Sequence, residues 1–253
     1  MSDAISVVVG GARGRMGSEV VAAVTVEPDL RLVGEVDAGD SLSSVLANTT
    51  PDAYVDFTLP DAVFANIEIA LRSKVVPIVG TTGLSVAQIE QVRSWCAEFQ
   101  TGALIAPNFA IGAVLLMRFS EIAAKYMPDV EIIEMHHERK LDAPSGTASK
   151  TAEMIARGRA SVTRTPLPSN AFETVTGARG GLSPGDVPVH SVRLPGFVAS
   201  EMVIFGGTGQ TLTIRHDSID RKSFMPGVIL ALRFVPQLKA NGGQLVYGLE
   251  NLI

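Results

Sequence analysis

The sequence predicts an α/β fold for the first part of the chain and an α+β fold for the rest. Strand and helix signals alternate through residues 1–107, and a glycine-rich turn follows the first strand. Neighbouring strands joined by short connections come later, after residue 130. Strands separated by helical stretches form right-handed βαβ units, so we expect a parallel sheet with helices on both faces.

The strands expected in the parallel sheet are short apolar runs that end near glycine, aspartate or proline. They cover residues 5–10, 31–37, 53–58, 75–80 and 103–107, with helices expected at 16–27, 61–73 and 85–99. Continuously apolar strands, such as the first one, are typical of a sheet that is covered on both sides.

The pattern changes in the later part of the chain. Helices are expected at 111–126, 146–157 and 222–236, and strands at 130–137, 190–194, 200–206 and 210–217. Residues 159–188 are rich in Pro, Gly, Ser, Thr and Arg, which is typical of a long loop. Adjacent strands with short connections predict a mainly antiparallel or mixed sheet.

Composition and charge exclude several classes of protein. The 253 residues carry a formal net charge of −5, so the overall charge does not favour binding to nucleic acid or to an anionic membrane. No apolar run approaches the roughly 18 residues of a membrane span, and no basic residue precedes Arg13 as a signal peptide requires. A single cysteine, Cys96, allows neither an intrachain disulfide nor a Cys/His metal site. We therefore expect a cytoplasmic protein with no metal.

The glycine-rich turn predicts dinucleotide binding. Gly11, Gly14 and Gly17 form the pattern G-x-x-G-x-x-G between the first strand and the first helix. Small residues let backbone amides approach a pyrophosphate, and the helix N-terminus favours its negative charge. Asp37 ends the second strand, 20 residues after Gly17, where a carboxylate accepts hydrogen bonds from ribose hydroxyls. A Rossmann-like sheet is therefore expected.

Two residues of this region predict different cofactors. Arg13 can pair with the phosphate that NADP carries on its adenosine ribose, whereas Asp37 repels that phosphate and favours NAD. The alternative is that Arg13 and its neighbour Arg15 are solvated loop charges. Because the two signals compete, we expect the chain to use both NADH and NADPH.

The segment 134–148 predicts a site for a small anion with a proton donor. His136, His137 and Lys140 lie close together, and histidine exchanges protons near neutral pH. Ser145 is the expected N-cap of the next helix, whose first amides would face a carboxylate. The alternative is a capped helix after a solvated basic strand end. His190 and His216 stand alone, and we expect both to be structural.

The segment HHERKLDAPSGTA at 136–148 resembles the signature of the 4-hydroxy-tetrahydrodipicolinate (dihydrodipicolinate) reductase family. Further matches are VVGGARGRMG, VDFT, VGTTG, APNFAIGA and FGGTGQTLTIRHDSIDRKSFMPGV, so the resemblance covers the whole chain. It implies reduction of 4-hydroxy-tetrahydrodipicolinate to tetrahydrodipicolinate by NAD(P)H in lysine and diaminopimelate biosynthesis. It also implies a dinucleotide-binding domain of residues 1–107 with 218–253. Residues 108–217 would bind the substrate and form a homotetramer.

The resemblance also implies roles for particular residues. His136 would donate the proton, Lys140 would be a second acid, and the cyclic dicarboxylate would contact His137, Ser145, Gly146 and Thr147. The expected cofactor contacts are Gly11, Ala12, Arg13, Gly14, Arg15, Met16, Asp37, Gly80, Thr81, Thr82, Ala106, Pro107, Asn108 and Phe109. The last seven follow the fourth and fifth strands, where ligands of open α/β sheets bind.

Two other classes of function remain as alternatives. A dehydrogenase for another small dicarboxylate or a semialdehyde would share the fold without needing the cluster at 136–140. A semialdehyde dehydrogenase would need a catalytic cysteine next to the nicotinamide, whereas Cys96 is expected in the middle of a helix of the first domain. A nucleotide-sensing regulator would need a DNA-binding element, and the sequence has no basic helix-turn-helix pattern.

Overall fold

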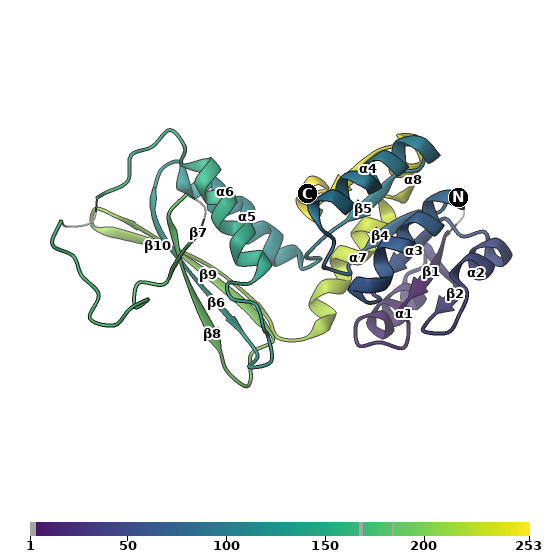
Figure 1. Ribbon diagram of the computed structural model, residues 1–253, viewed down its shortest axis with the longest axis horizontal. Helices are drawn as coiled ribbons and strands as arrows, with labels where there is room; N and C mark the ends of the chain where they lie inside the picture. The colour runs from purple at the N-terminus through teal and green to yellow at the C-terminus, as the bar shows by residue number, and fades with distance from the viewer. Residues whose placement is uncertain (1–3, 167–168, 184) are drawn as a thin grey trace. The chain divides into compact units, whose positions relative to one another are not determined.

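The computed structural model describes residues 4–166, 169–183 and 185–253, and the chain divides into two compact units (Figure 1). Unit 1 comprises residues 1–111 and 221–253, and unit 2 comprises residues 112–220. The sequence placed these divisions at 107/108 and 217/218. The chain therefore leaves unit 1, forms unit 2, and returns to finish unit 1.

Unit 1 contains a six-stranded sheet in the order β11-β5-β4-β3-β1-β2, in which every neighbouring pair is parallel. The strands are β1 (Ile5–Gly10), β2 (Leu30–Val36), β3 (Ala53–Asp56), β4 (Val76–Val79), β5 (Ala103–Ile105) and β11 (Leu245–Tyr247). The predicted parallel, Rossmann-like sheet is confirmed, and β11 is an addition that the sequence analysis did not foresee.

Helices cover this sheet and pack their buried side chains against those of the strands. They are α1 (Gly17–Val26), α2 (Leu42–Thr49), α3 (Pro60–Arg72) and α4 (Val86–Phe99), of which α2 was not expected. One cluster of buried side chains joins α3 and α4 to β4, β5 and β11, and includes Ile67, Trp95 and Cys96. Burial raises the pKa of the Cys96 thiol to about 12, so this cysteine is not a ready thiolate nucleophile.

Residues 221–253 complete unit 1. The single helix expected at 222–236 is instead a 3-10 turn (Arg221–Phe224), α7 (Met225–Arg233) and α8 (Val235–Ala240). Proline interrupts a continuing helix because it lacks the amide proton, and α8 restarts with Pro236 in its first turn. Helix α7 packs on α1, and Arg233 pairs with Asp29 at 2.7 Å.

Unit 2 contains a five-stranded mixed sheet in the order β10-β9-β6-β8-β7. Its strands are β6 (Asp129–His136), β7 (Gly181–Ser183), β8 (Val187–Arg193), β9 (Ala199–Gly207) and β10 (Gln210–Ser218). Only the β6–β8 pair is parallel, so the prediction of a mainly antiparallel or mixed sheet is confirmed. The loop expected at 159–188 contains β7 and the start of β8; residues 167–168 and 184 lie outside the described residues.

Helices α5 (Ile111–Ala124) and α6 (Gly146–Gly158) lie side by side in unit 2 (Figure 1). Arg157 of α6 pairs with Glu121 of α5 at 3.1 Å, and a Cβ at Gly158 would lie 2.2 Å from the Glu121 carbonyl oxygen. Successive side chains of a strand alternate between faces, so Val130, Ile132, Glu134 and His136 of β6 share one face. In the part of the chain that the structure describes, no helix is long and apolar enough to cross a bilayer.

Candidate active site

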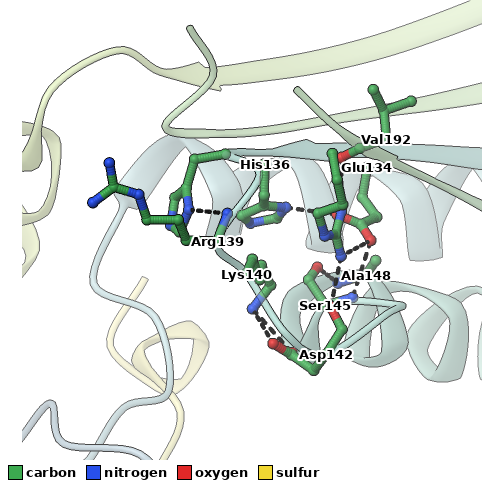
Figure 2. A network of polar contacts seen from close by, with 10 residues as sticks. Glu134, His136, Arg139, Lys140, Asp142, Ser145, Ala148 and Val192 are labelled. Atoms are coloured by element: carbon green, nitrogen blue, oxygen red, sulfur yellow. Dashed lines mark hydrogen bonds and ion pairs between the residues drawn. The ribbon is translucent and has the colours of Figure 1, made fainter. Parts of the chain in front are cut away.

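A buried carboxylate lies at the centre of the polar cluster in unit 2 (Figure 2). The Glu134 side chain is 0% exposed and lies 2.6 Å from Nδ1 of His136. The Arg193 guanidinium donates to both of its oxygens, at 2.7 Å and 2.9 Å. Such a bidentate pair holds the carboxylate in one orientation and stabilises its ionised form.

The strand geometry explains why these three side chains meet. Glu134 and His136 are two residues apart on β6, so they point to the same face of the sheet. In the parallel pairing of β6 with β8, Arg193 stands opposite His136 and therefore shares that face. The cluster is thus built on two paired strands rather than on a loop, which favours a defined geometry.

The partners of Glu134 decide its charge. Burial alone would raise its pKa, but hydrogen bonds from His136, Arg193 and Ser191 outweigh burial and lower the pKa to about 2. An ionised carboxylate only accepts hydrogen bonds, so Nδ1 of His136 must carry the proton between them. The other ring nitrogen, Nε2, then remains for proton exchange with a bound molecule.

The start of α6 is tied to the same cluster. Ser145 donates its backbone amide to Glu134 at 3.3 Å, and its hydroxyl caps α6 by accepting from Ala148 at 3.2 Å. Arg193 also donates to the carbonyl oxygen of Asp142 at 2.7 Å. A Cβ at Gly146 would meet nothing within 4 Å, so there is open space beside the first turn. A helix N-terminus open in this way suits an anion.

Lys140 lies next to this cluster (Figure 2), and both Lys140 and His137 have partners of their own. Lys140 Nζ contacts both carboxylate oxygens of Asp142, at 2.7 Å and 2.9 Å, and this bond lowers the pKa of Asp142. The lysine side chain is 22% exposed. His137 Nδ1 accepts from the Arg139 amide at 3.2 Å. Lys140 must therefore leave or share Asp142 to bind another carboxylate.

In unit 1, the glycine turn has no room for larger residues. Gly11 has a φ of +70°, and a Cβ there would lie 2.3 Å from the Phe57 carbonyl oxygen. A Cβ at Gly17 would lie 2.0 Å from the Gly11 oxygen. None of the described side chains caps α1, where the Ser18 amide donates to the Gly14 carbonyl oxygen at 3.0 Å, and a helix N-terminus favours an anion such as pyrophosphate. The turn thus fits a dinucleotide.

Arg13 and Asp37 converge at the end of β2. Asp37 accepts from the Arg13 amide at 2.7 Å, and the Arg13 guanidinium lies 3.6 Å from the same carboxylate. Asp40, which sequence analysis missed, accepts from Arg13 Nη2 at 3.3 Å and from the Asp37 amide at 2.8 Å. Amide hydrogen bonds from Ala38 and Arg13 lower the pKa of Asp37. Arg13 is thus shared between two carboxylates.

The turns after β4 and β5 form one pocket of about 80 Å³. Thr81, Thr82 and Pro107 line it, together with Gly83, Leu84, Ile89, Ile105 and Tyr247. Thr81 donates its hydroxyl to the buried Asp56 at 2.6 Å. Phe109 is 2% exposed and packs on Phe57, so its side chain belongs to the core of unit 1. The predicted cofactor residues at 80–82 and 106–109 therefore lie at one edge of the sheet.

Sequence reasoning missed two members of the unit 2 cluster. Glu134 could have been found, because a glutamate two residues before a histidine on a strand shares its face. Arg193 could not, since its place opposite His136 depends on the register between strands that are distant in the sequence.

These features define a class of protein: an α/β oxidoreductase with a dinucleotide-type sheet and a separate unit that holds an acid–base cluster. The chain belongs to the dihydrodipicolinate reductase family. The family model described as "Dihydrodipicolinate reductase, N-terminus" matches residues 5–109, and the one described as "Dihydrodipicolinate reductase, C-terminus" matches residues 112–253. The resemblance identified from the sequence is confirmed.

Similar proteins support the same membership. The chain is 47% identical to the 4-hydroxy-tetrahydrodipicolinate reductase of Syntrophomonas wolfei, over 100% of both chains. It is 46% identical to that of Coxiella burnetii, over 99% of this chain and 100% of the relative. A dipicolinate-bound dihydrodipicolinate reductase structure from Paenisporosarcina sp. TG-14 is 42% identical, with a TM-score of 0.86 over 99% of this chain and 100% of that chain. The family comprises NAD(P)H-dependent oxidoreductases that reduce 4-hydroxy-tetrahydrodipicolinate in lysine biosynthesis.

Proposed function

We propose that His136 donates the proton when this chain reduces 4-hydroxy-tetrahydrodipicolinate to tetrahydrodipicolinate. The observation that carries the proposal is the 2.6 Å contact between His136 Nδ1 and the buried, ionised Glu134. That contact fixes the ring with a proton on Nδ1, because an ionised carboxylate only accepts hydrogen bonds. The proton that is donated is a second one, carried on Nε2. Lys140 is a second acid close by.

The substrate would be held at the start of α6. The amides of Gly146 and Thr147 and the ammonium of Lys140 offer two kinds of partner for a carboxylate. His137 and Ser145 complete the proposed substrate contacts. The similar Paenisporosarcina structure is described as dipicolinate-bound, and dipicolinate is a small aromatic dicarboxylate. A cyclic dicarboxylate is therefore the class of ligand that we assign to this site.

The cofactor would lie along the strand ends of unit 1. The pyrophosphate would lie against the glycine turn formed by Gly11, Gly14 and Gly17. Asp37 would bind the ribose hydroxyls of NADH, and Arg13 would bind the ribose phosphate of NADPH. The remaining proposed contacts are Ala12, Arg15, Met16, Gly80, Thr81, Thr82, Ala106, Pro107, Asn108 and Phe109. When bound, the nicotinamide supplies the hydride. We propose that both NADH and NADPH serve, and that the enzyme is a cytoplasmic homotetramer assembled through unit 2.

The direct test is a spectrophotometric assay. The loss of NADH absorbance is followed after adding the synthase product made from pyruvate and aspartate semialdehyde. Turnover that depends on both that product and the enzyme supports the proposal. No oxidation of NADH or NADPH by enzyme with intact folding overturns it. Light scattering of the purified protein tests the tetramer separately.

Lys140→Met should raise KM for the dicarboxylate and lower turnover. A hydrogen bond to a charged group contributes about 1.5–3 kcal/mol, so we expect roughly a ten- to hundredfold loss of kcat/KM. The partial exposure of Lys140 argues against a larger effect. Pyridine-2,6-dicarboxylate should inhibit the natural enzyme competitively and bind this variant less tightly. Unchanged inhibition would place the carboxylate elsewhere; Lys150→Met, on the second turn of α6, is the control.

Asp37→Ala should reduce kcat/KM with NADH and spare or improve it with NADPH, whereas Arg13→Ala should do the reverse. Both side chains are partly exposed, so we expect changes of about two- to tenfold. The NADPH penalty of Arg13→Ala should shrink at high salt, because exposed charges are screened over about 8–10 Å. The measurement is the NADH to NADPH ratio of kcat/KM at low and high salt. Movement of the ratio in one direction for both variants would refute the assignment.

A further inference from the structure

A second buried carboxyl lies beside the Glu134–His136 pair, and nothing above gives it a role. Glu201 of β9 stands directly opposite Glu134 in the antiparallel pairing of β9 with β6. It is 5% exposed, and its Oε1 is buried without a hydrogen-bond partner among the described residues. Like charges directly opposite each other in a sheet repel, so the two carboxyls are not expected to be ionised together.

The partners of the two carboxyls decide which of them keeps a proton. Glu134 accepts from His136 and twice from Arg193, so it is the ionised member. Thr151 of α6 is a side-chain hydrogen-bond partner of Glu201. The Thr151 hydroxyl has one proton, which it donates to the Thr147 carbonyl oxygen at 3.0 Å. A neutral Glu201 can donate its own proton to the threonine oxygen, whereas an ionised Glu201 must share the Thr151 proton with the Thr147 carbonyl oxygen.

The other charged groups around Glu201 do not supply a further donor. On β10, His216 stands at the register position opposite Glu201, but burial lowers the pKa of His216 and so favours its neutral form. On α5, Glu121 pairs with Arg157 of α6. On β8, Arg193 is bound to Glu134 and to the Asp142 carbonyl. Burial raises the pKa of Glu201 to about 7; Thr151 opposes this shift, and the charge of Glu134 adds to it.

We propose that Glu201 is a positioning residue that holds a proton behind the Glu134–His136 pair and so controls how strongly that pair retains the proton of His136. The neutral acid leaves one negative charge next to His136, and loss of the Glu201 proton adds a second. His136 then keeps its proton to higher pH. This inference rests on the proposed role of His136 as the proton donor.

The size of the effect follows from the sheet geometry. Glu201 is diagonal to His136 across β6 and β9, and diagonal neighbours in an antiparallel pair are about 7–8 Å apart. At an effective dielectric constant of about 20, one charge at this distance shifts a pKa by roughly one and a half units. The proton of His136 should therefore be lost at a lower pH when Glu201 cannot ionise.

The test compares Glu201→Gln with the natural protein. The glutamine side chain is close in shape to glutamate but cannot ionise, so the alkaline limb of the kcat profile should move down by about one and a half pH units. The His136 imidazole, followed by nitrogen NMR without substrate, should titrate lower by the same amount. Glu153→Gln, which makes the same change on the exposed face of α6, should leave both curves in place.

The outcomes separate the two proposals. Superimposable His136 titrations in the natural protein and Glu201→Gln would overturn the role of Glu201, whatever the assay shows. A shifted His136 titration with an unmoved alkaline limb of the kcat profile would retain that role and reject His136 as the proton donor. If Glu201→Gln does not fold, infrared spectra of the natural protein with isotope-labelled glutamate decide. A protonated glutamate band that disappears near pH 7 supports the proposal, and its absence at about pH 6 contradicts it.

Discussion

Replacement of His136 by alanine should lower turnover by about 100- to 10,000-fold, because a positioned general acid typically contributes that much. NADH affinity should change little, since His136 belongs to unit 2 and the glycine turn belongs to unit 1. Turnover is measured in the NADH assay, and cofactor affinity by fluorescence titration.

A matched histidine provides the control for this variant. His190 lies on β8, and its ring pairs with Glu131 at 2.9 Å, on the face of the sheet opposite Glu134. His190→Ala should therefore retain turnover if the tetramer remains intact. Near-natural turnover in His136→Ala would show that another group donates the proton.

Replacement of Arg193 by methionine should destabilise unit 2 by about 3–5 kcal/mol, because it leaves Glu134 buried without its main cation. The Arg193 side chain is only 18% exposed and binds both Glu134 oxygens, so solvent cannot easily take its place. Chemical denaturation at neutral pH measures the loss. Arg157→Met removes a similar but exposed pair with Glu121 and should cost less than about 1 kcal/mol.

The same pair predicts how stability depends on pH. Glu134 has a pKa lowered from 4.5 to about 2, so its contribution is present above about pH 4.5 and is lost as the pH falls towards 2. The free energy of unfolding of the natural protein should therefore decline across this range. Arg193→Met should decline less. Equal slopes and equal stabilities would show that the Arg193 pair contributes nothing net.

The sequence predicted those parts of the fold that local pattern determines. The succession of short apolar strands and helices along the chain identified the parallel sheet. Ser145 was correctly expected to cap α6. Helix α2 was missed because its two serines, one asparagine and one threonine have low helix propensity, although Leu42 and Leu46 anchor it in the core. Strand β11 is only three residues long, and its pairing with β5 joins segments far apart in the chain.

The candidate sites show the same division. Glycine spacing and the double histidine indicated the two candidate sites, because small residues and titratable groups have a local signature. The partners that set their charge did not have one. Arg193 and Glu201 reach Glu134 from two other strands, and Asp40 reaches Arg13 across a turn. Such contacts depend on register and loop shape, which a single sequence does not encode in any short pattern.

The return of the chain to unit 1 has a consequence during synthesis on the ribosome. Helix α7, which pairs Arg233 with Asp29, and strand β11 are synthesised after the whole of unit 2. Until then, unit 1 lacks the strand that pairs with β5 and the helix that packs on α1. Unit 2 is contiguous and can fold during that interval. Order of translation would thus make the unit that begins first the last to become complete.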